Sequence, residues 1–109
     1  MPGTVIHLEN RKDFKAIAKK AERVIVKASA DWCGPCKQIT PYFDEWVEKN
    51  FTESIIIVKL DVDAGRDLAS FLKVQSIPQL FYFKNGYLEK TVIGADMAKI
   101  EKLLLSLLK

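Results

Sequence analysis

The sequence predicts an α/β domain with a mixed central β-sheet and helices on both faces. Three observations lead to this fold class: β-branched runs alternate with segments of helical periodicity, the run at 24–26 is continuously apolar and that at 55–60 is apolar except for Lys59, and Asn85-Gly86 joins the last two strand-like segments. Continuous apolar runs are typical of strands covered on both faces, and Asn-Gly is typical of a tight hairpin. We expect parallel crossovers followed by an antiparallel hairpin, in one domain over residues 1–109.

The first half of the chain supplies two strands and two helices. Residues 4–8 are predicted to form a short strand, and Asn10 can cap a helix that has Asp13 in its first turn. Residues 24–26 form the next strand. Pro41 lies inside the second helix, where a missing N–H predicts a kink. Apolar side chains recur at helical spacing in both helices: Phe14, Ile17, Ala18, Ala21, and then Ile39, Phe43, Trp46, Val47.

The second half continues the alternation and then ends in a hairpin and a helix. Residues 55–60 are predicted to be a strand, and 64–74 a loop with a short helix. Residues 79–83 and 87–93 are the strands of the hairpin. The final helix is expected to pack on the core, and not on a membrane or a partner, through one apolar face: Met97, Ile100, Leu103, Leu104, Leu107 and Leu108.

Composition excludes several classes of function. The 109 residues are 49% apolar and 28% charged, with a net charge of +3 and lysines scattered among acidic residues. A nucleic-acid-binding protein is expected to show a basic stripe, which is absent from this sequence. Residues 1–8 lack the features of a signal peptide, and the apolar runs are too short to cross a bilayer. We expect a cytoplasmic protein that binds neither nucleic acid nor membrane.

The chain has two cysteines, Cys33 and Cys36, placed between a predicted strand and a predicted helix. A cysteine attacks as its thiolate, so its pKa must fall from about 8.5. Free N–H groups and the positive end of the helix dipole favour an anion at such a junction. Gly34 allows the backbone to bend, and Pro35 is tolerated in the first helical turn.

This arrangement predicts thiol–disulfide exchange, with Cys33 as the attacking thiolate and Cys36 as the resolving thiol. We expect Cys33 to be the more exposed of the two. A zinc site is an alternative interpretation of the Cys-x-x-Cys spacing, but beyond the thiols the chain offers His7 alone as a typical nitrogen ligand. The spacing could also be without function. We expect no metal.

The segment Trp32-Cys33-Gly34-Pro35-Cys36-Lys37 resembles the active site of the thioredoxin family, and the similarity covers nearly the whole chain. Pro41 resembles the family's proline within the second helix, and Ile77-Pro78 its cis-proline loop. Lys84-Asn85-Gly86 is similar to its hairpin, and Gly94-Ala95 to a loop of its substrate groove. The resemblance implies the thioredoxin fold and a protein-disulfide reductase.

The same resemblance implies partners and a substrate surface. Electrons would come from NADPH through a flavoprotein thioredoxin reductase, to a domain that itself holds no cofactor and reduces disulfides of client proteins. Apart from the resemblance, we expect a monomer, since the sequence shows no obvious extra interface. An apolar patch for clients would surround the attacking sulfur, and the backbone of Ile77 would pair with an extended client segment. The implied patch consists of Trp32, Ile77, Pro78, Gly94 and Ala95.

One position departs from the family pattern: Lys27 occupies the place of a buried aspartate beneath the active site. Three interpretations stay open. An inward ammonium would lower the thiol pKa values and make the couple more oxidising. Repulsion from Lys59 on the neighbouring strand could leave Lys27 neutral, as a base for Cys36. Alternatively, its amine reaches solvent or pairs with Asp31 or Asp61.

Two other functions are compatible with this fold. A binding module that turns over slowly is one, because Lys27 and Gln79 both differ from the usual pattern. A specialised oxidant is the other, if the potential is strongly raised. Two thiols at this spacing favour the reductase, since a pure scaffold has no chemical need for them.

Overall fold

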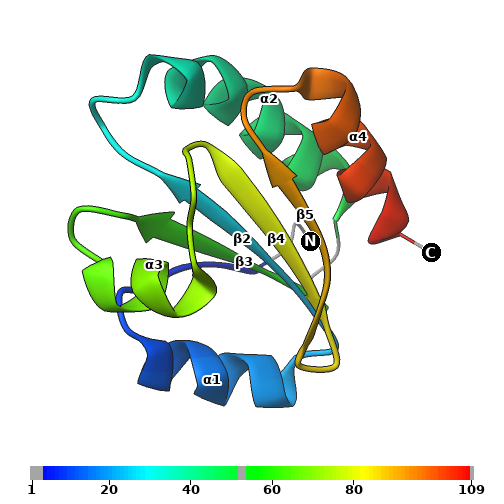
Figure 1. The fold of residues 1–109 in the computed structure, drawn as a ribbon. Helices are drawn as coiled ribbons and strands as arrows, with labels where there is room; N and C mark the ends of the chain where they lie inside the picture. The colour runs from blue at the N-terminus through cyan, green and yellow to red at the C-terminus, as the bar shows by residue number, and fades with distance from the viewer. Residues whose placement is uncertain (1–3, 52–53, 109) are drawn as a thin grey trace.

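The computed structural model describes residues 4–51 and 54–108, and shows five strands and four helices in the predicted order (Figure 1). The ends of the predicted domain, 1–3 and 109, lie outside the described residues. The elements are β1 (Thr4–His7), α1 (Arg11–Lys20), β2 (Arg23–Ser29), α2 (Gly34–Asn50), β3 (Ile55–Asp61), α3 (Arg66–Leu72), β4 (Gln79–Lys84), β5 (Tyr87–Ile93) and α4 (Met97–Ser106).

The sheet is mixed, as predicted, with strand order β1-β3-β2-β4-β5. β1, β3 and β2 are parallel, whereas β4 is antiparallel to β2 and to β5. The β4–β5 turn has positive φ angles at Asn85 (52°) and Gly86 (85°), the backbone that a two-residue hairpin turn of this kind requires. The Asn-Gly pair therefore sets the reversal that brings β5 to the edge of the sheet.

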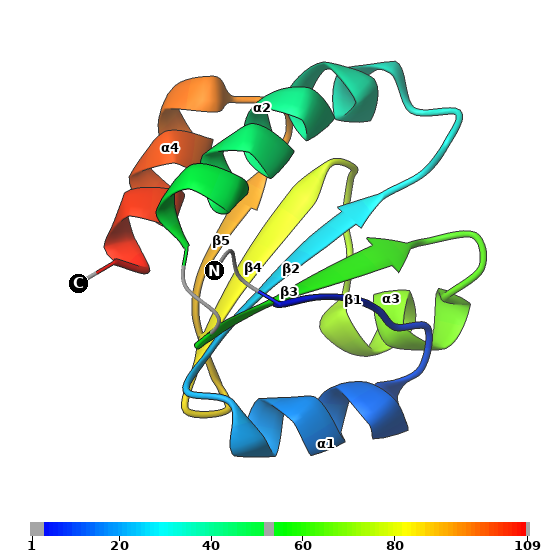
Figure 2. The same ribbon diagram turned by 180° about the vertical axis from the view of Figure 1, so that it is seen from behind.

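The helices cover both faces of the sheet in pairs (Figures 1 and 2). α1 and α3 lie on one face, and α2 and α4 on the other. Side chains alternate between the two cores along β2: Val24 and Val26 join the cluster with Phe14 of α1, whereas Ile25 joins the cluster with Phe43 of α2. The next residue on the α2 side is Lys27, so the alternation of the strand carries a charged side chain under α2.

The final helix follows its prediction over most of its apolar face. Ile100, Leu103, Leu104 and the following Leu107 are fully buried in the core on the α2 side. Two residues expected on that face differ: Met97 and Leu108 are exposed, because Met97 is the first residue of the helix and Leu108 lies beyond its end. Pro41 lies inside α2 as expected, and the kink remains a prediction. No described helix is long and apolar enough to span a membrane.

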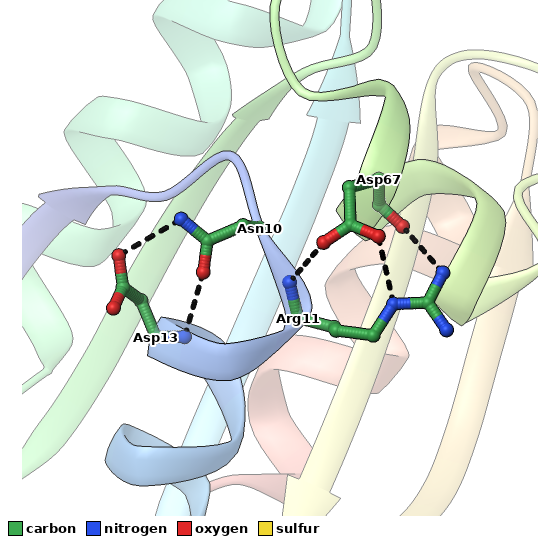
Figure 3. A network of polar contacts seen from close by, with 4 residues as sticks. All are labelled: Asn10, Arg11, Asp13 and Asp67. Carbon is green, nitrogen blue, oxygen red and sulfur yellow. Dashed lines mark hydrogen bonds and ion pairs between the residues drawn. The ribbon is translucent and has the colours of Figure 1, made fainter.

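The start of α1 is fixed by two sets of polar contacts (Figure 3). The Asn10 side chain accepts a hydrogen bond from the backbone N–H of Asp13 at 2.8 Å, as the N-cap prediction requires. The Asp67 carboxylate of α3 accepts from the backbone N–H of Arg11 at 2.8 Å and from its Nε at 2.7 Å. These contacts join the two helices that cover the same face of the sheet.

Replacing the α1 cap tests this account of the fold. We expect Asn10→Ala to lower the free energy of unfolding by about 1 kcal/mol, because an N–H at the start of α1 loses its acceptor. Asn50→Ala, at the exposed C-terminal end of α2, is the control and should change it by less than about 0.5 kcal/mol, since alanine favours the helix. Urea denaturation measures both. Equal effects would show that the Asn10 cap does not stabilise α1.

Candidate functional site

The two cysteines lie where β2 ends and α2 begins, and their sulfurs form a disulfide with a Cα–Cα distance of 5.3 Å. Cys33 is the N-cap of α2, and its sulfur accepts from the backbone N–H of Cys36 at 3.2 Å. The N–H of Cys33 donates to the Ala30 carbonyl at 3.1 Å, which holds the preceding turn. The Cys33 sulfur is thus at the positive end of the helix, where a thiolate is stabilised.

Both cysteines are buried, with exposed fractions of 4% for Cys33 and 2% for Cys36. Cys33 is the more exposed of the two, as predicted, but only slightly, because it too is almost fully buried. The adjoining loops account for this, since the Cys33 sulfur lies 3.8 Å from the carbonyl oxygen of Ile77 and packs with Val62. A client must therefore approach Cys33 through the surrounding cavity.

A cavity of about 530 Å³ opens beside Cys33. Its walls come from the active-site segment, the loop after β3, α3 and the loop before β4: Trp32, Cys33, Gly34, Pro35, Val62, Ala69, Val74, Gln75, Ser76 and Ile77. Trp32 is 68% exposed, and its indole Nε1 donates to the Asp63 carboxylate at 2.7 Å. Asp63 was missed by the sequence analysis, because no local pattern indicates a contact 31 residues away.

The predicted client patch is only partly assembled at this cavity. Trp32 and Ile77 line it, whereas Pro78 is buried, and Gly94 and Ala95 are half-buried. The Ile77–Pro78 peptide bond is cis, as the resemblance implied. The Pro78 carbonyl accepts from the Gly94 N–H at 2.8 Å. Gly94 has a φ of +92°, which favours glycine. Pro78 and Gly94 therefore hold adjacent loops together.

Gln79 is buried, and both ends of its amide are bonded. Its Oε1 accepts from the backbone N–H of Gln75 at 2.9 Å, and its Nε2 donates to the Thr91 hydroxyl at 3.2 Å. The side chain therefore ties the loop before β4 to the edge strand β5. This structural function accounts for Gln79 without a separate binding role.

Lys27 is 3% exposed, on the strand beneath α2. Its Nζ donates to the Thr40 hydroxyl of α2 at 2.7 Å and lies 5.3 Å from the centre of the Phe43 ring. The suggested pairing with Asp31 or Asp61 was wrong: the helix-facing side of β2 directs the amine to Thr40 instead. Burial lowers the pKa of Lys27 to about 8; the Asp44 charge opposes this shift and the Lys59 charge adds to it.

Lys59 lies opposite Lys27 in the parallel β2–β3 register, as expected for neighbouring strands. It is partly exposed and pairs with Asp44 of α2 at 3.2 Å. Sequence reasoning missed Thr40 and Asp44, although helical spacing from Cys36 could have found them: they follow it by four and eight residues and so share its face of α2.

The part of the chain that the structure describes contains no cluster of metal-ligating side chains. No group of three His, Cys, Asp or Glu side chains there is placed to hold an ion. His7, the candidate nitrogen ligand, lies on β1 opposite Lys59 of β3 in the parallel register of the two strands.

The buried Lys27 gives a prediction about stability and pH. Its pKa of about 8 in the folded state is below the ordinary 10.5, so the unfolded state binds more protons between these values and stability rises with pH. We therefore compare the free energies of unfolding of the wild type and Lys27→Met, both oxidised. Between pH 7 and 10 the wild-type value should rise by about 2 kcal/mol relative to that of the variant, after allowance for solvent in the adjoining cavity.

Urea unfolding of the oxidised proteins at several pH values measures this difference. At pH 7 the methionine variant should be the more stable, because an apolar side chain of similar length replaces a buried charge. Lys37→Met, which removes an exposed lysine of the neighbouring helix α2, is the matched control and should show no such trend. A wild-type to Lys27→Met difference that is constant across pH would contradict a buried, charged Lys27.

Comparison with known proteins agrees with this geometry. The thioredoxin family model matches residues 4–106. Thioredoxin-2 of Pyricularia oryzae is 38% identical over 93% of the chain, which spans 58% of that protein. Thioredoxin of Gallus gallus is 36% identical over 90% of the chain and 93% of its own length. The crystal structure of Malassezia sympodialis thioredoxin matches with a TM-score of 0.86 at 30% identity, covering 97% of this chain and 93% of that one.

These similarities span the cysteine pair, both cores and every strand of the sheet. The family together with two cysteines at disulfide distance supports dithiol–disulfide reductase activity, and makes this domain a thiol–disulfide oxidoreductase. Proteins of this kind act on disulfides of client proteins. The chain belongs to the thioredoxin family.

Proposed function

We propose that the chain reduces protein disulfides in two steps, with Cys33 attacking and Cys36 resolving. The observation that carries this assignment is the position of Cys33 as the N-cap of α2, with its sulfur bonded to a helical N–H. That sulfur also lines the cavity beside Trp32, where a client disulfide can reach it. Cys36 lies within the first helical turn, where it can reach Cys33 but does not line the cavity beside Trp32.

The electron count of the cycle balances. The Cys33 thiolate attacks one client sulfur, and the other client sulfur leaves as a thiolate that takes a proton from water. Cys36, as a thiolate, then attacks the Cys33 sulfur and releases the second client sulfur. The client disulfide gains two electrons, and the Cys33–Cys36 pair loses two as its disulfide forms.

Client recognition follows from the cavity beside Cys33. The exposed Trp32 ring offers apolar contact area, and the Ile77 backbone lies next to the attacking sulfur. An extended client segment that pairs with this backbone would bring its disulfide to Cys33. Pro78 and Gly94 support this surface by holding the adjacent loops, and Ala95 packs on the core next to them.

The oxidised pair must be reduced again after each cycle. We propose that a flavoprotein thioredoxin reductase supplies the electrons from NADPH, and that the domain binds no cofactor itself. A reducing compartment suits such a cycle, so we place the protein in the cytoplasm. We propose that it works as a monomer, since one chain supplies both cysteines and the whole cavity.

Paired serine variants test the order of the two steps. We expect Cys36→Ser to accumulate mixed disulfides with many clients, because the attack proceeds but the resolving sulfur is missing. Cys33→Ser should trap none and should lose insulin reduction by more than about a hundredfold, with NADPH and a thioredoxin reductase present. Non-reducing gels with mass spectrometry identify the trapped clients.

The two variants are each other's controls, since each removes one sulfur atom at one end of the same disulfide. Trapping by Cys33→Ser in place of Cys36→Ser would reverse the assignment. If the wild type failed to reduce insulin even with a chemical reductant, and Cys36→Ser trapped few clients, the chain would be a binding module and not a reductase.

A further inference from the structure

A second cavity, of about 650 Å³, lies against Cys36. It is distinct from the cavity beside Cys33, and the proposed exchange of sulfurs assigns it no function. More than half of its lining residues have ionisable side chains, and they come from β1, β2, β3, α2 and the adjoining loop: His7, Lys27, Ser29, Ala30, Asp31, Cys36, Lys37, Thr40, Pro41, Lys59, Leu60 and Asp61. The resolving cysteine therefore faces a site where charges can act on it.

Lys27 is fixed close to Cys36 by a chain of two hydrogen bonds. Its Nζ donates to the Thr40 hydroxyl at 2.7 Å, and that hydroxyl donates to the carbonyl oxygen of Cys36 at 2.8 Å. The amine is thus held beside the same turn of α2 that carries the resolving sulfur. A flexible lysine in solvent would not keep such a position.

Lys27 is also the one buried charged side chain among residues 4–51 and 54–108. Its acidic neighbours are engaged elsewhere or exposed: Asp44 pairs with Lys59, and one Asp61 oxygen accepts from the N–H groups of Asp63 and Ala64. Three further ionisable residues of the cavity are exposed, so solvent screens their charges: His7, Asp31 and Lys37. The Lys27 charge is therefore the least screened of the charges near Cys36.

We propose that Lys27 is a positioning residue that stabilises the thiolate of Cys36 as its buried counter-ion. The inference rests on the proposed function, in which Cys36 must ionise to resolve the mixed disulfide. The Cys36 thiol gives its proton to water in the cavity, and its thiolate forms opposite the Lys27 ammonium. The thiolate then attacks the Cys33 sulfur, and the client leaves as a thiolate that water protonates.

The protonation state of Lys27 distinguishes this function from that of a base. With a pKa of about 8, the amine carries its proton in most molecules at neutral pH. A group that is already protonated cannot accept the Cys36 proton, but it attracts the resulting anion. Once the thiolate has formed, the pair of opposite charges also lessens the cost of keeping the ammonium buried.

A titration of Cys36 alone tests the proposal. In Cys33→Ser, Cys36 is the single thiol, and absorbance at about 240 nm follows its ionisation with pH. We expect Lys27→Met in this background to raise the Cys36 pKa by at least about one unit, which is a tenfold loss of thiolate at pH 7. Lys37→Met, which removes an exposed lysine from the same cavity, should shift it by less than about half a unit because solvent screens that charge.

A kinetic profile adds a second readout. Resolution of a mixed disulfide on Cys33 should be about tenfold slower in Lys27→Met at pH 7 and should approach the wild-type rate above pH 10, where Cys36 ionises in both proteins. A purely structural function of Lys27 would lower the rate equally at every pH. If the Cys36 pKa were the same with and without the Lys27→Met substitution, in two proteins that are both folded, the proposal would be overturned.

A measurement on the wild-type Lys27 side chain covers the case in which Lys27→Met fails to fold. Coupling between two charges is reciprocal, so the Lys27 pKa, followed by NMR, should be higher in Cys33→Ser than in Cys33→Ser with Cys36→Ala. An unchanged Lys27 pKa would exclude the ion pair. Neither titration needs a client or a reductase, so loss of insulin reduction with these shifts intact would count against the proposed function alone.

Discussion

The meeting of strand β2 with the first turn of α2 is the constraint on which the site depends. A helix that begins there presents N–H groups without backbone partners, and the Cys33 sulfur satisfies one of them. The sheet fixes the strand end, and the two cores fix the helix against the sheet. The position of one sulfur atom is therefore set by the whole domain, and both loops around it, at Val62 and Ile77, pack onto it.

Lys27 shows how the same framework places a charge at a cost to stability. The alternation of β2 directs this side chain under α2, one step beyond Ile25 of the apolar core and beside the polar side chain of Thr40. Nothing in the packing requires a charge there, since an apolar side chain of similar length, such as methionine, would fill the space. The lysine has a function to perform only when Cys36 ionises, so the protein trades stability in the oxidised state for control of one thiol.

The fold could be predicted from the sequence because its strongest patterns are local. β-branched runs, the Asn10 cap and Asn85-Gly86 each specify their own segment, and the structure confirms all of them. The cysteine pair was found for the same reason. The contacts around it could not be found in this way, since Asp63 meets Trp32 only after β3 and α2 are placed. The partner of Lys27 was predicted wrongly, because strand alternation indicates which face of the sheet a side chain occupies but not which residue of the covering helix it contacts.

Cys33 and Cys36 are chemically distinct thiols because of their different places at the start of α2. Alkylation of the reduced protein with iodoacetamide, mapped to each cysteine by mass spectrometry across pH 5 to 9, tests this directly. We expect Cys33 to react first, with an apparent pKa below the ordinary value of about 8.5. Preferential alkylation of Cys36, or equal rates at both sulfurs, would contradict it.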